Sequence, residues 1–348
     1  MADTRPALPA VLAIDGGNSK TDVALVAADG TLLASVRGPG ANHEHVGVDG
    51  AMRILGEIVK DVAARVGGAA GAGPDGLVAR HISSCLAGAD LPEEEEQLAA
   101  ALRGQGWSLT SAVANDTFAV LRAGLTAAPG QPPWGVAVTC GAGINCAGMA
   151  PDGRTTRFLA LGRLTGDWGG GWYLGQEVMW WSMRAEDGRG PDTALRQATA
   201  AYFGLPTVRD VAVGVHLGRI AREELLGLTT VLFEAASGGD AVARDLLERL
   251  AEEVATMART TMRRLALTGE GTPVVLGGAL LAARHPVLTL AIERRLAAAA
   301  PGAVPHVADV PPVAGAALLG LDYLGAGADA ERRLRSAGSF RPPVMSPE

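Results

Sequence analysis

The sequence predicts an α/β protein with two lobes of the same fold, each of which opens with a strand, a polar turn and a β-hairpin. Three observations support this expectation. The 348 residues exceed the roughly 250 to 300 at which a single hydrophobic core stops growing. Apolar strand patterns alternate with helical patterns. The order of strand, glycine-rich turn and hairpin near residue 11 recurs near residue 134, so we expect duplicated lobes with a central cleft.

The first lobe is expected over residues 1–116. Its apolar run 11–14 is followed by a polar turn and by "TDVALVAADGTLLASVRG", whose Asp29–Gly30 pair is typical of a hairpin turn. Residues 47–67 have the apolar spacing of a helix, "HISSCLAG" predicts a strand, and "LPEEEEQLAAALRGQG" predicts a helix that begins at Pro92. "LTSAVAND" predicts a further strand. Because a hairpin follows the first turn, this order differs from a Rossmann start, where a helix follows.

The second lobe is expected over residues 117–330. Its opening segment, "GVAVTCGAGINCAGMAPDGRTTRFLALG", repeats the strand, the turn and the hairpin, which closes at Asp152–Gly153. Residues 170–267 have mainly helical patterns, "TPVVLGGAL" predicts a strand and a turn, and "LLAARHPVLTLAIERRLAAAA" predicts one helix. "VPHVAD" predicts a short strand, and "VAGAALLGLDYL" predicts a closing helix.

The remaining segments are expected to be loops. Stretches rich in Gly, Ala and Pro at 67–75 and 127–133 indicate loops within the lobes, and we place the hinge between the lobes near residues 116–119. The tail 331–348, rich in Pro, Ser and Arg, is expected to be loose.

Composition argues against several classes of partner. The formal net charge of −7 gives no electrostatic footprint for nucleic acid or an anionic membrane. The first ten residues lack the basic and apolar regions of a signal peptide, and no uninterrupted run of about 18 apolar residues follows. Three sparse cysteines (Cys85, Cys140 and Cys146) suit neither a disulfide framework nor a paired-cysteine metal site. We expect a soluble protein of the reducing cytoplasm without nucleic-acid or membrane partners.

Two polar turns carry the expected chemistry. "DGGNSKTD" and "TCGAGINC" each follow an apolar strand and precede a hairpin, and such turns present backbone N–H groups and hydroxyls to an anion. Either turn alone fits an ordinary loop, but their recurrence favours a pair that binds the phosphates of a nucleoside triphosphate. Asp15, which ends the first strand, is placed to hold Mg²⁺ through water. The candidate phosphate-binding residues are Gly16, Gly17, Asn18, Ser19, Lys20 and Thr21 in the first turn and Thr139, Gly141, Ala142 and Gly143 in the second.

These residues resemble the actin-like ATPase superfamily, whose members have ribonuclease-H-like lobes and include sugar kinases, chaperones and actin. Within it the chain is similar to the branch of N-acetylglucosamine kinases and BadF/BadG/BcrA/BcrD-type ATPases, and it resembles glucosamine kinases of the actinobacterial type. The resemblance spans about residues 10–325 and rests on the ordered set "DGGNSKTD", "ANHEHVG", "CLAGAD", "AND", "TCGAGINCAG", "GDWGGGWYLG", "VVLGGAL" and "PPVAGAALLG". It implies ATP as cofactor, adenosine contacts at Gly277 and Gly278, and a place for Gly315 in the second connecting helix.

Asp116 in "VANDTF" follows a strand and opens a helix. A carboxylate at that place is, by itself, also compatible with an N-terminal helix cap. In sugar kinases of this branch the matching aspartate accepts the proton of the attacking hydroxyl, so the resemblance implies that Asp116 is the general base and contacts the substrate. Phosphoryl transfer depends mainly on positioning and charge neutralisation, and a carboxylate at the hinge would serve both.

Further residues match the sugar-binding positions of the branch. Asn42 and His43 of "ANHEHVG" match an Asn-His segment, although a loop asparagine also commonly bonds to its own backbone. Gly88 of "CLAGAD" would let the chain approach the sugar closely. Amide and carboxylate groups bind sugar hydroxyls with directional hydrogen bonds. The other expected substrate contacts of this kind, together with the glycine of the second turn, are Gly143, Asn145 and Asp167.

One motif departs from the branch. N-acetylglucosamine kinases typically have "GDEGS" where this chain has "GDWGG", so Trp168 replaces a glutamate beside the expected sugar site. A tryptophan face stacks on sugar rings, but this exchange weakens the case for recognition of an N-acetyl amide. A free amine is cationic and pairs with a carboxylate such as Asp167 or Glu177. We therefore expect the 6-hydroxyl of glucosamine as the acceptor, with N-acetylglucosamine as the alternative.

Two functions of other classes stay open. A BadF-like ATPase that activates a partner enzyme through a shared iron–sulfur cluster would need two ligand cysteines presented together, which the spacing of Cys85, Cys140 and Cys146 does not favour. A sugar-sensing regulator would need a DNA-binding module, and no helix-turn-helix pattern precedes residue 11. By resemblance we expect a homodimer that binds an amino sugar and ATP; the sequence leaves open the exact sugar, the phosphoryl donor and the divalent ion.

Overall fold

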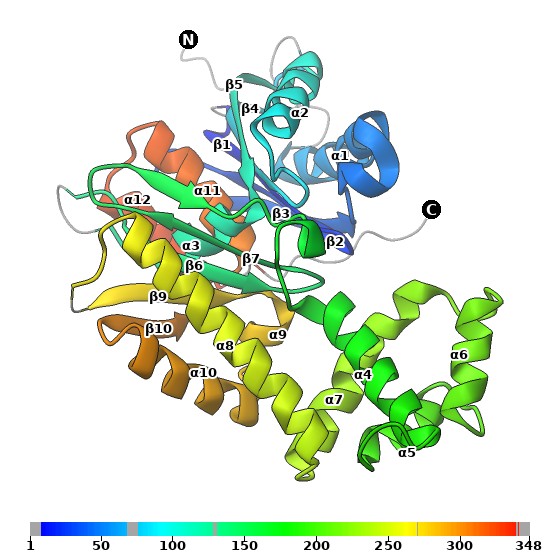
Figure 1. Ribbon diagram of the computed structural model, residues 1–348. Helices are drawn as coiled ribbons and strands as arrows, with labels where there is room; N and C mark the ends of the chain where they lie inside the picture. The colour runs from blue at the N-terminus through cyan, green and yellow to red at the C-terminus, as the bar shows by residue number, and fades with distance from the viewer. Residues whose placement is uncertain (1–7, 68–75, 128–130, 270, 339, 341–348) are drawn as a thin grey trace, which may run out of the picture. The chain divides into compact units, whose positions relative to one another are not determined.

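The computed structural model describes residues 8–67, 76–127, 131–269, 271–338 and 340 (Figure 1). The chain forms two compact units. The first takes its described residues from 1–134, 151–153 and 308–348, and the second consists of those in 135–150 and 154–307. The loop expected at 67–75 falls almost wholly outside the described residues; of the loop expected at 127–133, residues 127 and 131–133 are described and belong to no helix or strand.

The first unit is built on a five-stranded mixed sheet in the order β3-β2-β1-β4-β5. β1, β2 and β3 are antiparallel neighbours, and β4 and β5 run parallel to β1. The hairpin between β2 and β3 turns at Gly30, whose φ of 84° is accessible to glycine at little cost. The strands are β1 (Val11–Gly16), β2 (Lys20–Val26), β3 (Leu32–Pro39), β4 (Ala79–Leu86) and β5 (Ser108–Asn115).

The second unit repeats this topology. Its sheet has the order β10-β9-β6-β7-β8, in which β6, β7 and β8 are antiparallel neighbours and β9 and β10 run parallel to β6. The position of each strand in one sheet therefore has a counterpart in the other, and the predicted duplication is confirmed. The strands are β6 (Gly135–Cys140), β7 (Ile144–Met149), β8 (Thr155–Arg157), β9 (Thr272–Gly277) and β10 (Ala303–Val307).

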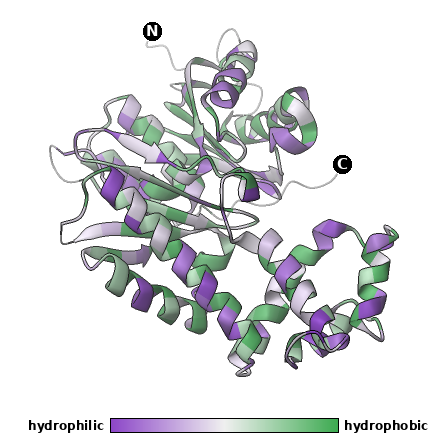
Figure 2. Ribbon diagram, viewed as in Figure 1, coloured by the Kyte–Doolittle hydropathy of each residue, from purple (hydrophilic) through white to green (hydrophobic). Residues whose placement is uncertain are grey.

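Alternating residues of β1 supply two cores on opposite faces of the first sheet. Leu12 and Ile14 belong to a cluster formed with the first two helices, whereas Val11 and Ala13 belong to a cluster formed with the helix near residue 317. Figure 2 shows the strongly hydrophilic start of α2, which is the "PEEEE" segment. The helices of this unit are α1 (His43–Gly67), α2 (Pro92–Gly104), α3 (Asp116–Gly124), α11 (Pro312–Tyr323) and α12 (Ala328–Ser336).

The second unit is mainly helical between its strands, as predicted. The amphipathic helix α8 (Ala241–Arg264) packs on β6 and β7, and α10 (Pro286–Ala299) packs on α8. The single helix expected over residues 280–300 is instead two helices, because Arg284 has a φ of 51° and Pro286 lacks the N–H that a continuous helix needs. The other helices are α4 (Gly170–Glu186), α5 (Ala194–Tyr202), α6 (Val208–His216), α7 (Leu228–Ser237) and α9 (Gly278–Ala282), with 3₁₀ turns at Gly162–Leu164 and Arg222–Gly227.

Two expectations about boundaries need correction. The division expected at residue 116 lies inside the first unit, because α3 packs against α11, which also contacts β1. The tail expected to be loose from residue 331 is helical in α12 as far as Ser336, with Leu334 fully buried. Residue 339 and residues 341–348 of that tail lie outside the described residues.

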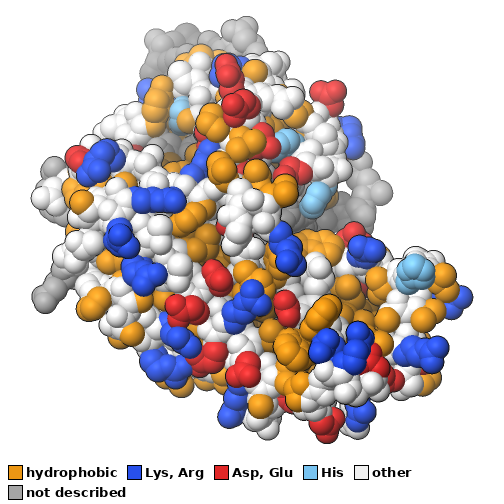
Figure 3. All heavy atoms as spheres, viewed as in Figure 1, with side chains coloured by type: hydrophobic (Ala, Val, Ile, Leu, Met, Phe, Trp, Pro, Cys, Tyr) orange, Lys and Arg blue, Asp and Glu red, His pale blue; other side chains and the backbone are white. Residues whose placement is uncertain are grey.

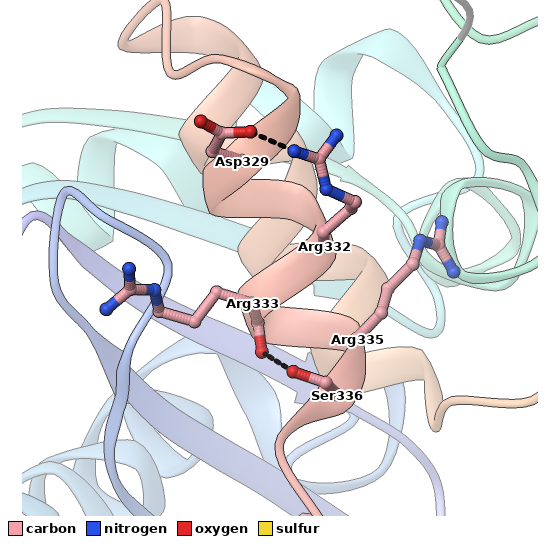
Figure 4. A pocket seen from close by; sticks show the side chains of 5 residues that line it. All are labelled: Asp329, Arg332, Arg333, Arg335 and Ser336. Atoms are coloured by element: carbon pink, nitrogen blue, oxygen red, sulfur yellow. Dashed lines mark hydrogen bonds and ion pairs between the residues drawn. The ribbon is translucent and has the colours of Figure 1, made fainter.

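Arginines of α12 are paired rather than free. Figure 4 shows Arg332 hydrogen-bonded to Asp329, while Arg333 and Arg335 extend in different directions. Arg333 meets Asp29 of the first hairpin at 3.0 Å, and Arg335 donates to backbone carbonyls of α3. On the molecular face in Figure 3, cationic and anionic side chains are interspersed. No helix in the described ranges is long and apolar enough to cross a membrane.

Candidate active site

The parallel strands of the first sheet bring separate sequence motifs to one edge. Gly16 at the end of β1 lies opposite Leu86 at the end of β4, and Leu86 lies opposite Asn115 at the end of β5. Ligands of open α/β sheets bind beyond these carboxyl ends. The polar turn after β1, the loop containing Gly88 and the helix start at Asp116 therefore meet at the edge where binding is expected.

In the first polar turn residues 18–20 are exposed to solvent, whereas Thr21 at its end is buried. The N–H of Gly17 donates to the carbonyl of Lys20 at 2.9 Å, and Asn18, Ser19 and Lys20 are exposed. The side chain of Lys20 is 48% exposed and lies 3.2 Å from a carboxylate oxygen of Asp22. Thr21 is buried, and among the described residues its hydroxyl has no hydrogen-bond partner.

Three carboxylates gather near this turn, and only part of their charge is compensated. Asp15 lies directly opposite Asp22 across β1 and β2. Asp22 is buried but accepts hydrogen bonds from Arg37 at 2.6 and 2.8 Å. Burial, Asp116 and Asp22 together raise the pKa of Asp15 to about 8, against the opposing influence of Lys20 and Arg37.

Asp15 is therefore a carboxylate whose ionised form calls for a nearby cation. This chemistry fits Mg²⁺, which typically binds one or two protein carboxylates together with substrate phosphates and water. Within the described residues no group of three His, Cys, Asp or Glu side chains is arranged to hold a metal ion. Phosphate oxygens and water would have to supply the other ligands.

Asp116 is the first residue of α3, and the helix cap is its neighbour. Asn115 accepts a hydrogen bond from the N–H of Thr117 at 3.0 Å, so Asn115 performs the capping role considered for Asp116. Burial raises the pKa of Asp116 to about 6, although hydrogen bonds from Thr117 oppose this shift. The side-chain amide of Asn115 also donates to Asp90 at 2.7 Å, which ties the end of β5 to the loop after β4.

Asn42 joins the expected sugar loop to the first polar turn. Its amide nitrogen donates to Asn18 at 2.6 Å and to Glu44 at 3.0 Å. Its amide oxygen accepts from the N–H of Glu44 at 2.9 Å, so the local backbone role also occurs. A Cβ on Gly88, whose φ is +80°, would lie 2.6 Å from that oxygen. Both the conformation and the space at Gly88 therefore require glycine.

His43 lies beside the same loop. Its Nε2 is 4.0 Å from Glu94 of α2, its side chain is largely buried, and its Nδ1 has no hydrogen-bond partner among the described residues. Asn42, His43 and Gly88 are thus brought together in the first unit, next to Asn18 of the polar turn.

The second polar turn is held by close backbone contacts. The N–H of Gly141 donates to the carbonyl of Gly143 at 2.9 Å, and Thr139 lies opposite Asn145 in the hairpin. Thr139 also lies opposite Gly277 of β9. A Cβ on Gly278, whose φ is +77°, would lie 2.5 Å from the backbone of Cys140. The sheet therefore places the expected adenosine and phosphate segments at one edge of the second unit.

The start of α4 packs on this second turn. The N–H of Gly171 donates to Gly141 at 2.8 Å, and that of Trp172 donates to Ala142 at 3.0 Å. A Cβ on Gly170 would lie 2.5 Å from Gly143. The glycines of "GDWGGG" therefore allow the chain to approach the turn, and they fix Asp167 and Trp168 just before α4.

Asp167, Trp168 and Glu177 line a cavity of about 310 Å³ in the second unit. Trp168 is only 8% exposed, and the guanidinium carbon of Arg249 lies 3.9 Å from the centroid of its ring. One ring face is thus occupied by an arginine rather than presented to a ligand. Asp167 accepts a hydrogen bond from the hydroxyl of Thr165 at 2.6 Å.

Several residues around these sites were absent from the sequence prediction. Asp22 stands in the quoted motif "DGGNSKTD", and a carboxylate at the start of the apolar run of β2 was the available signal. Arg37 and Arg163 lie in hairpin and loop segments without a motif, and Arg249 lies in an arginine-rich helical pattern that resembles an ordinary solvated face. Contacts between distant segments alone bring Arg37 to Asp22 and Arg249 to Trp168.

The three cysteines are buried and separate. Cys85 lies in the first unit, and Cys140 and Cys146 lie on β6 and β7 of the second. Burial raises the pKa of Cys140 and of Cys146 to about 12, and it raises that of Cys85 as well. Iron–sulfur clusters bind thiolates. Thiols held in their protonated form inside the core do not fit the cluster-bearing alternative.

Known proteins are similar to this chain over most of its length. An N-acetylmuramic acid/N-acetylglucosamine kinase of Clostridium acetobutylicum is 25% identical over 275 residues, which cover 78% of this chain and 85% of that protein. An N-acetyl-D-glucosamine kinase of Dictyostelium discoideum is 26% identical over 316 residues, which cover 89% and 97%.

A solved structure has the same fold. A candidate N-acetylglucosamine kinase of Chromobacterium violaceum superimposes with a TM-score of 0.69 at 25% identity, over 91% of this chain and 100% of that one. The sequence profile of the BadF/BadG/BcrA/BcrD ATPase family matches residues 12–320. Both polar turns and almost all of both sheets fall within that range. The expected actin-like fold is therefore confirmed, and the chain belongs to the BadF/BadG/BcrA/BcrD ATPase family.

Proposed function

We propose that this protein is an ATP-dependent amino-sugar kinase that phosphorylates the 6-hydroxyl of glucosamine, with N-acetylglucosamine as the alternative acceptor. The observation that carries the proposal is Asp116, a partly buried carboxylate of raised pKa at the same sheet edge as Asp15 and the first polar turn. A general base works best with a pKa near the operating pH. The kinases named among the relatives act on amino sugars.

The roles follow from the groups present. Asp116 would accept the proton of the sugar hydroxyl as that oxygen attacks the terminal phosphoryl group, and ADP would leave. Asn42, supported by Gly88, would orient the sugar through its amide. Backbone N–H groups of the two polar turns would bind the phosphates. Mg²⁺ near Asp15, when bound, would neutralise charge on the phosphates.

The choice between the two acceptors rests on the groups around Trp168. Asp167 and Glu177 line one cavity and are carboxylates of the kind that a cationic amine requires. This arrangement supports glucosamine. The names of both relatives given above support N-acetylglucosamine, since each includes that sugar. The preferred acceptor is the sugar with the higher kcat/KM.

The decisive experiment measures sugar-dependent release of ADP from Mg²⁺-ATP. Glucosamine, N-acetylglucosamine, N-acetylmannosamine, glucose and buffer alone are compared for the wild type and Asp116→Asn. We expect turnover with one amino sugar and a loss of at least about 100-fold in Asp116→Asn, the typical contribution of a general base. ATP binding, measured by calorimetry, should survive.

The matched control is Asp61→Asn, which removes a carboxylate from the exposed side of α1, where it pairs only with Arg65 among the described residues. Its activity should equal that of the wild type. ATP hydrolysis that is independent of any sugar, or no turnover with any of them, would overturn the kinase proposal.

A further inference from the structure

The loop between β4 and α2 contacts the start of α3 in the first unit. It follows Leu86, the last residue of β4, which lies opposite Asn115 at the end of β5. Asp90 stands in this loop, at the end of the segment "CLAGAD", two residues before α2 begins at Pro92. From the sequence, only Gly88 of this segment had an expected role. The structure gives Asp90 a contact with Asn115 as well.

The backbone of Asp90 is held by α2. One carboxylate oxygen of Glu94 accepts hydrogen bonds from the N–H groups of Asp90, at 3.0 Å, and of Leu91, at 2.8 Å. A glutamate in the first turn of a helix commonly reaches back in this way. The helix itself is anchored in the core through Leu98 and Leu102. Asp90 therefore has a fixed position beside the start of α3.

Asp90 determines which end of the Asn115 amide faces α3. The amide nitrogen of Asn115 donates to Asp90 at 2.7 Å, and its oxygen accepts from the N–H of Thr117 at 3.0 Å. A carboxylate only accepts hydrogen bonds, whereas an amide has one donor end and one acceptor end. Because Asp90 takes the donor end, the oxygen is left for Thr117. A reversed amide would set two donors against each other at the helix cap.

This cap surrounds the candidate general base. Asp116 lies between Asn115, which caps α3, and Thr117, which also donates hydrogen bonds to the carboxylate of Asp116. Asn115 and Thr117 are buried, so water does not readily replace a lost cap. A misplacement of about 1 Å in a catalytic arrangement costs on the order of 100-fold in rate. The orientation of the Asn115 amide therefore bears directly on the position of Asp116.

We propose that Asp90 is a positioning residue for Asp116: by orienting the amide of Asn115 it fixes the start of α3, and with it the carboxylate that takes the proton of the sugar hydroxyl. All of these contacts lie within the first unit. The inference rests on the proposed role of Asp116 as general base, and it adds a residue outside the expected site to that role.

The kinetic test compares Asp90→Ala with Asp90→Asn, using the sugar that supports the fastest release of ADP. Asp90→Ala should lower kcat about tenfold, less than loss of the base itself, and leave KM for ATP within about twofold. Asp90→Asn should keep kcat within about threefold of the wild type, because its amide oxygen still accepts from Asn115. The matched control is Asp61→Ala, whose carboxylate pairs only with Arg65 among the described residues and whose activity should equal that of the wild type.

A second variant tests the route of the effect. If Asp90 acts through Asn115, introducing Asp90→Ala into Asn115→Ala should change kcat by less than about twofold, since residues that act through one contact are not additive. A full further loss in that background would overturn the inference. So would equal losses of kcat in Asp90→Asn and Asp90→Ala, because the charge of Asp90 rather than its hydrogen bond to Asn115 would then matter.

Hydrogen exchange separates this inference from the kinase proposal, because it needs no turnover. The N–H of Thr117, followed by NMR, should exchange on the order of tenfold faster in Asp90→Ala than in the wild type or Asp61→Ala, the effect of a weakened hydrogen bond. Exchange at Ile82 in the middle of β4 should not change, which shows that the fold is intact. Unchanged exchange at Thr117 would overturn the inference whatever the activity. Faster exchange in a protein that phosphorylates no sugar would refute the kinase proposal and support the positioning of α3 by Asp90.

Discussion

At the residue scale, Gly88 shows how a position without a side chain lets two segments of the candidate site lie close together. Its φ of +80° disfavours any other residue, and a Cβ added there would lie 2.6 Å from the amide oxygen of Asn42. The sequence predicted that Gly88 lets the chain approach the sugar closely, and this stays a prediction. Within the first unit the structure shows a close approach to the amide of Asn42, which in turn contacts the polar turn through Asn18.

We predict that Gly88→Ala weakens sugar binding as well as the fold. The backbone conformation alone should cost about 1 kcal/mol of stability, since a left-handed φ is unfavourable for alanine. The added methyl must also displace Asn42, so KM for the sugar should rise several-fold. The control is Gly153→Ala, which has a φ of +85° and no atom within 4 Å of the added position. An unchanged KM in Gly88→Ala would contradict this role.

At the scale of elements, the loop before α1 and the turn between β1 and β2 are joined by one short hydrogen bond. The side chains of Asn42 and Asn18 lie 2.6 Å apart, and Asn42 is buried. The sequence assigned one residue to the sugar and the other to a phosphate. Their contact means that the two segments hold each other in place.

We predict that these two residues are energetically coupled. Asn18→Ala and Asn42→Ala should each raise KM for both substrates, and the double variant should be less impaired than the sum, by about 1 kcal/mol, because the hydrogen bond is lost only once. The measurement is a double-mutant cycle on KM for ATP and for the sugar. Additive effects would show that the contact does not link the two segments. Asp61→Ala and Arg65→Ala, a surface pair, provide the comparison.

At the scale of the whole molecule, the end of the chain completes the first unit. Arg122 of α3 is 1% exposed and bonds to Asp322 of α11 and to Glu331 of α12, which is 209 residues away in sequence. Arg335 joins the same network through Glu331. Burial alone would raise the pKa of Glu331, but hydrogen bonds and charge from Arg122 and Arg335 outweigh it and lower that pKa.

We predict that Glu331→Gln destabilises the first unit by about 2 kcal/mol at neutral pH, the scale of a hydrogen bond to a charged group. The lowered pKa of Glu331 means that its contribution is fully present above about pH 4.5, the usual value in the unfolded chain, and is lost as pH falls through the folded value. Urea unfolding at neutral and acidic pH measures this difference, which should shrink in acid.

Asp61→Asn serves as the control in the same unit, because an exposed i,i+4 pair contributes less than about 1 kcal/mol. A difference between the wild type and Glu331→Gln that stays constant as pH falls would contradict the assigned pKa direction.

The sequence predicted local features well where the physical signal is local. The apolar run of β1, the Asp29–Gly30 turn and the start of α2 at Pro92 depend on neighbouring residues only, and the structure has all three. The helix break before Pro286 and the helical α12 were missed. In α12 the polar composition suggested a loose tail. The helix is instead held by the buried side chain of Leu334 and by the ion pair between Glu331 and Arg122, and a local sequence pattern does not reveal such contacts with distant residues.

By itself, then, the sequence determined that this protein has duplicated sheets, a polar turn after the first strand of each, and a carboxylate at the start of α3, because each depends on chain order and short-range chemistry. Only the tertiary structure decided which charges meet. It placed Arg37 on Asp22, Arg122 on Glu331 and Arg249 on Trp168. The sequence around an arginine looks much the same whether its side chain is solvated or paired. Its role depends on its burial and on its partners, and both are set by contacts between segments that are distant in sequence.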